Sequence, residues 1–443
     1  MDDNGLPGLV YHGMVTSSMP NVTSTLIYNK KGDNGVWASS TIDTPLTFVV
    51  DSNPEPSAFT FFNTDDPIVA YGGSSFYPHW AVNTSTDFVT TSISGSNAVG
   101  ISTEMGLAYD STDEEVAIAY VSGGQLYFST SSLPTPTVAW DGSLSSITEA
   151  ESYSWTKLIY ANSQYNYFFA GLEDGNYYVE LTTSTSGADG TWSEVVQAFD
   201  TPIKVLSEDG NLYTMFDIQY NASTSYFGLT AYVSSTNVMF FATSTDGMTW
   251  GTENEIYNSG GSGDEWVTSI DFLEGTDYIA ITFEYDSVAL SSDAGVNWTS
   301  STIDVVDPDN DDLFAVGIAT GSVLHAVYRA SSTQDFVYTS STDDGVSWTT
   351  SSIFSPNGTG ATYNKFMLDG NGRPSALLYD QSFFGDTSAS GTMYFASLES
   401  GVWSTSTIGV TEHTFSDGSE VASPDMGFYG AKPYMVYYGD DNY

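Results

Sequence analysis

An aromatic residue, nearly always tryptophan, recurs along the whole chain at intervals of about 50 residues, in most cases followed by a stretch rich in serine and threonine. The eight positions are Trp37, Phe88, Trp140, Trp192, Trp250, Trp298, Trp348 and Trp403. Such a period is typical of a ring or array of small, similar sheets, because each unit must bury its apolar face against its neighbours. We therefore expect residues 1–443 to form one repeat domain with a period of about 52 residues.

One repeat, residues 313–353, reads as four extended segments separated by Gly, Asp and Ser turns: LFAVGIAT, SVLHAVYRA, DFVYTSS and TTSSI. Blocks of four short strands at this spacing are typical of propeller blades. The sequence predicts an all-β fold, a β-propeller of about eight four-stranded antiparallel blades, with seven blades as the alternative.

The two ends of the chain carry strands that belong to one blade. The N-terminal segment GLPGLVYHG has the pattern of a second strand, and the C-terminal segment SPDMGFYGAKPYMVYYG has the pattern of a first and a second strand. Sharing one blade would close the ring and remove exposed sheet edges. The C-terminus contributes one strand more than a four-stranded closure needs. The alternative that the chain is a segment of a longer array therefore also stays open.

The turn before the tryptophan carries the sharpest local motif. The segments SSDAGVNW and STDDGVSW both read Ser-x-Asp-x-Gly-x-x-Trp, and STDGMTW is one residue shorter. Asp accepts hydrogen bonds from amides one or two residues on, Gly adopts a positive φ, and Trp covers the corner with a large apolar face. The motif residues are Ser244, Asp246, Gly247, Trp250, Ser291, Asp293, Gly295, Trp298, Ser341, Asp343, Gly345 and Trp348.

This motif resembles the Asp-box (BNR) repeat of the sialidase-like β-propeller superfamily, and the blade pattern extends the resemblance over nearly the whole chain. In that family the boxes lie on the outer rim, away from the central site. The resemblance therefore implies a structural role for the motif residues.

Sialidase activity is excluded by counting arginines. Sialidases clamp the substrate carboxylate with three arginines in bidentate hydrogen bonds, which lysine reproduces poorly. This chain contains only Arg329 and Arg373, and it lacks the Arg-Ile-Pro motif of that family. Other propellers of this kind are glycoside hydrolases that use two carboxylates. With 55 acidic residues no pair can be singled out, so we assign no catalytic residue and expect a module without enzymatic activity.

The net charge of −47, from 55 Asp and Glu against 8 Lys and Arg, restricts the partners. Nucleic acids and anionic membranes both require basic residues, so we exclude them as partners. No apolar run approaches the ~20 residues of a membrane-spanning helix, so we expect no membrane insertion.

Two kinds of minor site are predicted. Asp307, Asp309 and Asp311 in the segment DPDNDD have the alternating carboxylates that Ca²⁺ accepts, and we expect no other cofactor. N-glycosylation sequons occur at Asn21, Asn83, Asn221, Asn297 and Asn357. His325 lies within an apolar strand, and we interpret it as a core residue.

These observations predict an extracellular, cell-surface or virion-surface propeller that acts as a binding, attachment or display module for glycans or a surface protein. The 30 tyrosines and 10 tryptophans suit sugar stacking and protein contacts. One alternative is a polysaccharide-cleaving glycoside hydrolase with a carboxylate pair. Another is a structural subunit of a filament, lattice or virion, for which a homo-oligomer or a larger particle would be the working form.

Overall fold

The computed structural model describes the strands of the chain and many of the turns between them. The described residues are 8–15, 21–31, 37–49, 58–62, 66–72, 78–83, 88–93, 105–110, 115–122, 125–132, 145–149, 153–174, 176–186, 191–203, 205–208, 211–214, 216–233, 238–258, 269–273, 276–283, 287–303, 315–319, 323–330, 335–355, 364–368, 372–383, 388–414, 425–429 and 432–439. All regular elements among them are β-strands, and no helix there has the length and apolar character of a membrane span.

Four-stranded antiparallel sheets follow one another along the first half of the chain. Sheet 1 consists of β4 (Ala58–Phe62), β5 (Asp66–Gly72), β6 (Pro78–Asn83) and β7 (Phe88–Ser92). Sheet 2 consists of β8 (Gly106–Asp110), β9 (Glu115–Ser122), β10 (Gln125–Ser132) and β11 (Ser145–Glu149). Sheet 3 consists of β12 (Tyr153–Ala161), β13 (Gln164–Glu173), β14 (Asn176–Ser184) and β15 (Val196–Gln197).

The second half of the chain continues the pattern. Sheet 4 consists of β18 (Phe216–Asn221), β19 (Tyr226–Val233), β20 (Val238–Ser244) and β21 (Asn254–Asn258). Sheet 5 consists of β22 (Ser269–Phe272), β23 (Ile279–Phe283), β24 (Ser287–Ser291) and β25 (Thr299–Thr302). Sheet 6 consists of β26 (Ala315–Ala319), β27 (Val323–Arg329), β28 (Phe336–Ser341) and β29 (Thr349–Phe354). Sheet 7 consists of β30 (Asn364–Leu368), β31 (Pro374–Phe383), β32 (Ser388–Glu399) and β33 (Val402–Thr414).

The two ends of the chain meet in one sheet. This closing sheet has the order β34 (Asp425–Tyr429), β35 (Lys432–Gly439), β1 (Gly8–Val15), β2 (Asn21–Lys31) and β3 (Trp37–Val49). Strands β35 and β1 pair in parallel, with Tyr11 opposite Tyr437. Both strands have the second-strand pattern and run in the same direction, so the sheet holds five strands where a simple closure would hold four.

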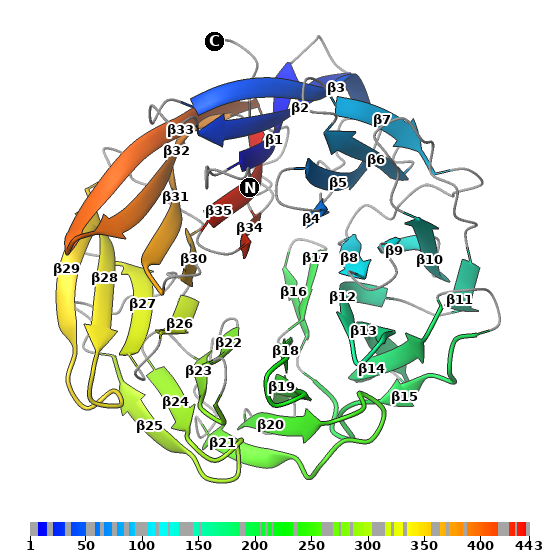
Figure 1. The fold of residues 1–443 in the computed structure, drawn as a ribbon, viewed down its shortest axis with the longest axis vertical. Coiled ribbons are helices and arrows are strands. Elements are labelled where there is room, and N and C mark those ends of the chain that lie inside the picture. The colour runs from blue at the N-terminus through cyan, green and yellow to red at the C-terminus, as the bar shows by residue number, and fades with distance from the viewer. Residues whose placement is uncertain are drawn as a thin grey trace.

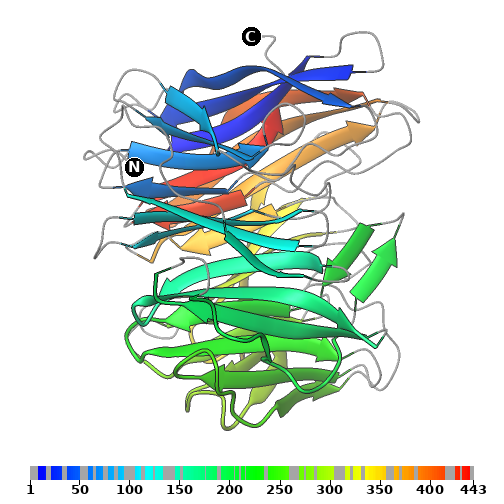
Figure 2. The same cartoon turned by 90° about the vertical axis from the view of Figure 1, so that its right-hand side faces the viewer.

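The sheets stand around a central axis, each with its first strand innermost and its last strand on the rim (Figure 1). The innermost strands contact one another in order, from β4 through β8, β12, β18, β22, β26 and β30 to β34. Figure 2 shows the same ring from its edge. The protein is therefore an all-β propeller, and the four segments predicted within residues 313–353 are confirmed as β26–β29.

Burial changes from the axis to the rim in a way that explains the sequence pattern. All eight residues of β19 are buried, because a second strand is covered on both faces by neighbouring sheets. The last strands β25 and β29 expose most of their Ser and Thr residues. Apolar clusters lie between adjacent sheets, as in the cluster of Phe128, Leu158 and Phe169 between sheets 2 and 3. The stability of the ring thus rests on contacts between neighbouring sheets.

An extra hairpin interrupts the repeat between sheets 3 and 4. It consists of β16 (Val205–Glu208) and β17 (Asn211–Thr214), which pair only with each other and lie toward the centre of the ring (Figure 1). The hairpin explains why the interval between Trp192 and Trp250 is the longest in the chain. Glu253 stabilises the link between sheets 3 and 4. Its carboxylate accepts hydrogen bonds from the Thr201 hydroxyl and the Asp200 amide, both at 2.6 Å.

A buried phenol connects the closing sheet to sheet 1. The Tyr71 hydroxyl in β5 donates a 2.7 Å hydrogen bond to Asp43 in β3. Burial and the Asp43 carboxylate raise the pKa of Tyr71 far above its usual range, so the phenol stays protonated and keeps donating. This hydrogen bond joins sheet 1 to the closing sheet.

Candidate functional site

The motif turns form nearly identical hydrogen-bond networks. In the turn of sheet 5 the Ser291 hydroxyl donates to Asp293 at 2.9 Å and accepts from the Gly295 amide at 2.9 Å. Asp293 also accepts from the Asn297 amide at 2.8 Å, and the Trp298 indole donates to the Gly295 carbonyl at 2.9 Å. The Ser–Asp and Ser–Gly bonds recur in the turns of residues 244–250 and 341–348.

The aspartates of these turns are held in their charged form. Hydrogen bonds from the backbone and side chain of Asn297 hold the pKa of Asp293 below its usual value. Asp343 has a lowered pKa for the same reason, with its bonds coming from Ser347. A carboxylate that accepts several N–H and O–H bonds favours its ionised state. These turns are thus fixed local structures that carry permanent negative charge at the rim.

The tryptophan of each turn packs on the sheet that precedes its own. The ring pairs, with their centroid distances, are Trp192–Phe128 at 4.7 Å, Trp250–Phe168 at 6.2 Å, Trp298–Phe241 at 5.0 Å and Trp403–Tyr338 at 5.1 Å. Edge-to-face aromatic pairs of this kind contribute about 1 kcal/mol beyond the burial of their area. The twelve motif residues therefore form three separate rim turns that connect neighbouring sheets, and they do not converge on one site.

The predicted minor sites have different outcomes. Asp307, Asp309 and Asp311 lie outside the described residues, and within the described ones no group of three acidic or histidine side chains could hold a metal ion. Asn357 also lies outside the described residues, whereas Asn21 and Asn83 lie on β2 and β6.

The sequons at Asn221 and Asn297 differ in accessibility. Asn221 is only 3% exposed, and its amide donates to the Thr276 carbonyl at 3.1 Å. Asn297 is exposed, although its amide donates to Asp293 at 2.6 Å. A glycan on Asn221 would require buried hydrogen bonds to break, whereas Asn297 has room for one.

His325 is a core residue, as predicted, and lies between sheets 6 and 7. It is 6% exposed, and its Nδ1 lies 2.6 Å from the Tyr338 hydroxyl. Burial lowers the pKa of His325 to about 4, so the ring is neutral near pH 7. Its Nε2 is buried and has no hydrogen-bond partner within the described structure, so the prediction of a core residue holds while the hydrogen bonding is incomplete.

The two faces of the ring follow from the strand order. The turns between first and second strands and between third and fourth strands, including the motif turns, share one side, which we name the turn side. The second-to-third turns and the links between sheets share the opposite side, which we name the link side. The β16–β17 hairpin belongs to a link, and it stands at one flat side of the ring (Figure 2).

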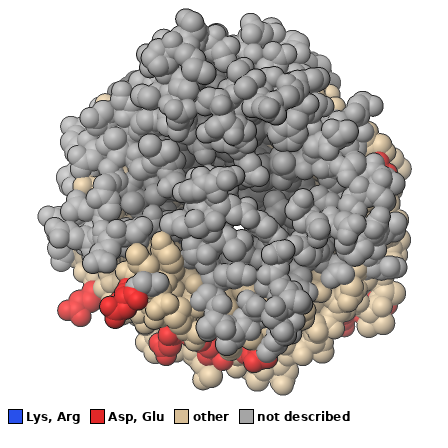
Figure 3. All heavy atoms as spheres, turned by 180° about the vertical axis from the view of Figure 1, so that it is seen from behind, with Lys and Arg blue, Asp and Glu red and all other residues tan. Residues whose placement is uncertain are grey.

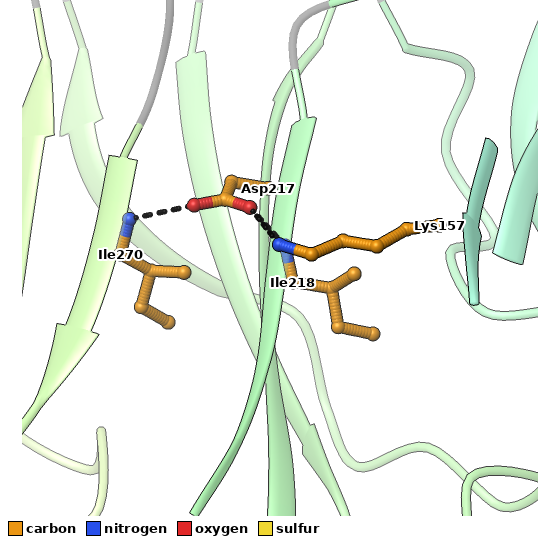
Figure 4. A network of polar contacts seen from close by, with 4 residues as sticks. All are labelled: Lys157, Asp217, Ile218 and Ile270. Atoms are coloured by element: carbon orange, nitrogen blue, oxygen red, sulfur yellow. Dashed lines mark hydrogen bonds and ion pairs between the residues drawn. The ribbon is translucent and has the colours of Figure 1, made fainter. Parts of the chain in front are cut away.

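An ionic network joins three innermost strands on the wall of the central axis (Figure 4). Lys157 in β12 lies 2.9 Å from Oδ1 of Asp217 in β18. Oδ2 of Asp217 accepts a 3.0 Å hydrogen bond from the Ile270 amide in β22, and Oδ1 also accepts from the Ile218 amide at 2.8 Å. One carboxylate thus fixes the relative positions of sheets 3, 4 and 5 beside the inserted hairpin.

A second polar group lies on the face of sheet 3 that is turned toward sheet 2. Strand register places Glu180 opposite Phe169 on β13 and opposite Gln197 on β15, and it places Tyr178 opposite Gly171. Side chains two residues apart on a strand point to the same face, so Tyr178 and Glu180 are neighbours. Glu173, Tyr178, Glu180 and Gln197 are all at least partly exposed, and we name them the Glu180 cluster.

Glycine makes room for the carboxyl group of this cluster. A Cβ at Gly171 would overlap the Glu180 carboxylate, which occupies the space that a side chain there would fill. The Gln197 amide donates a 2.7 Å hydrogen bond to Glu173. Burial, and to a smaller extent the charge of Glu173, raise the pKa of Glu180 to about 7. Near neutral pH the cluster therefore holds a mixture of protonated and ionised Glu180.

The sequence analysis did not single out this cluster. Tyr178 and Glu180 lie in the segment NYYVEL of the third strand β14, whose pattern matches that of the other third strands. A lone glutamate between Val179 and Leu181, both fully buried, is the signal that could have marked the position. Glu173 and Gln197 have no such signal, because only the strand register brings them to it.

No protein-family model and no curated protein matches the chain. Solved structures with a similar arrangement include the WD40 domain of SCAP from fission yeast, with 11% identity over 85% of this chain and 90% of that chain and a TM-score of 0.47. The BP39L lectin from Burkholderia pseudomallei has 12% identity over 79% of this chain and 99% of that chain, with a TM-score of 0.47. The NanB sialidase from Streptococcus pneumoniae has 11% identity over 96% of this chain and 87% of that chain, with a TM-score of 0.36. All three TM-scores lie below 0.5.

Proposed function

We propose that this protein is a carbohydrate-binding propeller that serves as an attachment module at an extracellular or particle surface. The observation that carries the proposal is the Glu180 cluster, which combines a half-buried carboxyl, a second carboxylate, an amide and a tyrosine on one accessible face. Sugar sites use this combination, because an aromatic ring covers the apolar face of a pyranose while short polar groups bond its hydroxyls.

The protonation of Glu180 suits a hydroxylated ligand. A protonated carboxyl both donates and accepts hydrogen bonds, as sugar hydroxyls do, whereas an ionised carboxylate only accepts. The Gln197 side-chain oxygen is a further acceptor, because only the nitrogen is used by Glu173. The cluster can therefore satisfy several hydroxyl groups without a charged ligand.

Charge selects neutral glycans over acidic ones. The net charge of −47 repels uronate, sulfate and sialate groups, and Glu173 adds a local negative charge at the cluster. Lys157, the basic residue of the inner-wall network, is already paired with Asp217. We therefore expect the preferred ligand to be an uncharged oligosaccharide.

A glycan array with neutral and acidic oligosaccharides, followed by titration calorimetry with the strongest neutral ligand, tests the proposal. Tyr178→Ala and Glu180→Ala should each weaken binding by about tenfold or more, which corresponds to about 1.4 kcal/mol. Glu194→Ala is the matched control, because Glu194 is an exposed acid of the same sheet outside the cluster. An array without neutral ligands, or full binding by both cluster variants, would reject the proposal.

A second candidate is a glycoside hydrolase, and it is favoured by one specific observation. Glu180 has a pKa of about 7 beside Glu173, and an acid poised near neutrality next to a second carboxylate is the pairing that hydrolases use. Glu180 would protonate the glycosidic oxygen, and Glu173 would activate water or attack the sugar. Release of reducing ends that Glu180→Gln abolishes, with ligand binding retained, would favour the hydrolase over the binding module.

A further inference from the structure

The most exposed large apolar side chains of the described structure occupy one repeated position. Val296, Val346 and Val402 are 69%, 83% and 68% exposed, whereas the next valines, Val89 and Val195, are 38% and 37% exposed. Each of the three directly follows a glycine in the turn of sheet 5, 6 or 7; Val296 and Val346 lie two residues before the tryptophan, and Val402 lies one residue before it. A single exposed valine is common on protein surfaces and needs no explanation. Similar exposure in three successive sheets indicates that the repeat itself places an apolar side chain at the rim.

Rigid turns present these valines to solvent. Gly295, Gly345 and Gly401 directly precede them, with φ values of 84°, 76° and 81°. This left-handed conformation turns the chain outward, and in sheets 5 and 6 the hydrogen bonds of Asp293 and Asp343 hold the turn. The valines therefore stay exposed without the freedom of a loop.

An open strand edge follows the valine in sheets 5 and 6. Strands β25 and β29 end their sheets, so one side of each backbone has no strand partner within the described structure. Their first four residues are TSST and TTSS, nearly all of them exposed. Sheet edges are usually blocked by lysine or proline, and these two strands carry neither.

Negative charge borders both edges. Asp293 and Asp343 have lowered pKa values and stay ionised, and Asp344 directly follows Asp343 in the turn of sheet 6. In the view of Figure 3 the Asp and Glu side chains of the described part lie along the rim, and no Lys or Arg is visible there. A second copy of the chain brings the same charge, so edge-to-edge self-pairing is repelled, whereas a cationic segment is attracted.

We propose that the outer edge of sheet 6, and its counterpart in sheet 5, binds an extended cationic polypeptide segment as an added strand. The backbone of the segment pairs with β29 or β25, which needs no particular sequence. Its Lys or Arg residues lie near the turn aspartates, and an apolar side chain covers Val346 or Val296. This surface lies on the rim, apart from the Glu180 cluster, so it does not depend on carbohydrate binding.

The test uses a fluorescent synthetic peptide of alternating lysine and valine, with a counterpart in which glutamate replaces lysine. Anisotropy should show binding of the lysine peptide that weakens with salt, and no binding of the glutamate peptide. The double variant Val296→Lys/Val346→Lys should weaken binding by about tenfold or more. The matched control Val89→Lys/Val195→Lys adds the same two charges on sheets 1 and 3 and should have a much smaller effect.

Hydrogen exchange on the full-length protein locates the peptide. Binding of the peptide should slow exchange at the amides of residues 299–302 and 349–354. Equal losses in the Val89/Val195 control and in the Val296/Val346 variant would mean non-specific attraction and overturn the proposal. Unchanged exchange at both β25 and β29 with the peptide bound would also overturn the proposal. So would a dimer of the protein in solution that the Val296/Val346 variant dissociates, because the edge would then bind a second copy.

Discussion

The Trp298 indole meets the Phe241 ring edge to face, with centroids 5.0 Å apart, and the two residues belong to neighbouring sheets. Trp298 also donates a 2.9 Å hydrogen bond to Gly295 within its own turn. One side chain therefore closes its turn and joins its sheet to the previous one. The motif turns are thus best understood as the connectors of a ring whose stability depends on its junctions.

Removing the Trp298 indole should weaken the junction between sheets 4 and 5. Trp298→Ala should lower the free energy of unfolding by about 3 kcal/mol, because it leaves a cavity against Phe241. Trp298→Phe keeps the aromatic contact and loses only the hydrogen bond, so it should cost about 1 kcal/mol. Urea denaturation of both variants checks the order, and equal losses would show that the ring contact does not matter.

Two glycines with the same backbone conformation separate strain from steric overlap. Gly401→Ala places a Cβ at φ 81° in open space and should cost about 1 kcal/mol. Gly295→Ala has φ 84°, but its Cβ would also overlap the Phe241 ring, so it should cost about 1–3 kcal/mol more. Thermal unfolding of both variants measures the two losses of stability. A larger loss for Gly401→Ala than for Gly295→Ala would contradict the packing of Phe241 against Gly295.

His325 should make the protein sensitive to acid. Its pKa is about 4 in the folded protein and 6.5 when unfolded, so the unfolded chain binds more protons between these values. Stability is therefore fully present above pH 6.5 and falls as the pH drops toward 4, by up to about 3 kcal/mol. Other groups titrate in the same range, so the quantity to compare is wild type against His325→Phe.

In His325→Phe the Tyr338 hydroxyl loses its partner, which lowers stability equally at all these pH values. The difference in unfolding free energy between wild type and variant should therefore change between pH 7 and pH 4, in favour of the variant at pH 4. A difference that stays constant with pH would show that His325 does not titrate as described.

Glu180 should act in the opposite direction. Its pKa is raised from 4.5 to about 7 in the folded protein, so the native state binds the extra proton. The resulting stabilisation is fully present below pH 4.5 and is lost as the pH rises through 7. Glu180→Gln removes this dependence, so the melting temperature of the variant should gain on wild type between pH 5 and pH 8. If the melting temperature of the variant instead gained on that of wild type as the pH fell from 8 to 5, the result would contradict the raised pKa of Glu180.

Much of the architecture follows from local patterns in the sequence. Trp250, Trp298 and Trp348 mark turns, and the apolar second strands such as β19 are buried on both faces as their composition requires. These features depend on neighbours within about ten residues, which is why the period and the strand types could be predicted. The meeting of the two chain ends also followed from their strand patterns.

Contacts between sheets could not be predicted in the same way. Neither the pairing of Trp298 with Phe241 nor the three-strand network of Lys157, Asp217 and Ile270 leaves a periodic trace, because each depends on how separate sheets are placed. The Glu180 cluster depends on strand register and on the missing side chain of Gly171. In the sequence, the only trace of the β16–β17 hairpin is the longer interval between Trp192 and Trp250.

The most direct test of the functional account is a crystal structure of the protein with the strongest neutral oligosaccharide from the array. The account predicts a sugar ring against Tyr178, with hydroxyl groups within hydrogen-bond distance of Glu180 and Gln197. A sugar bound only elsewhere on the ring, with the Glu180 cluster unchanged and open to solvent, would contradict it.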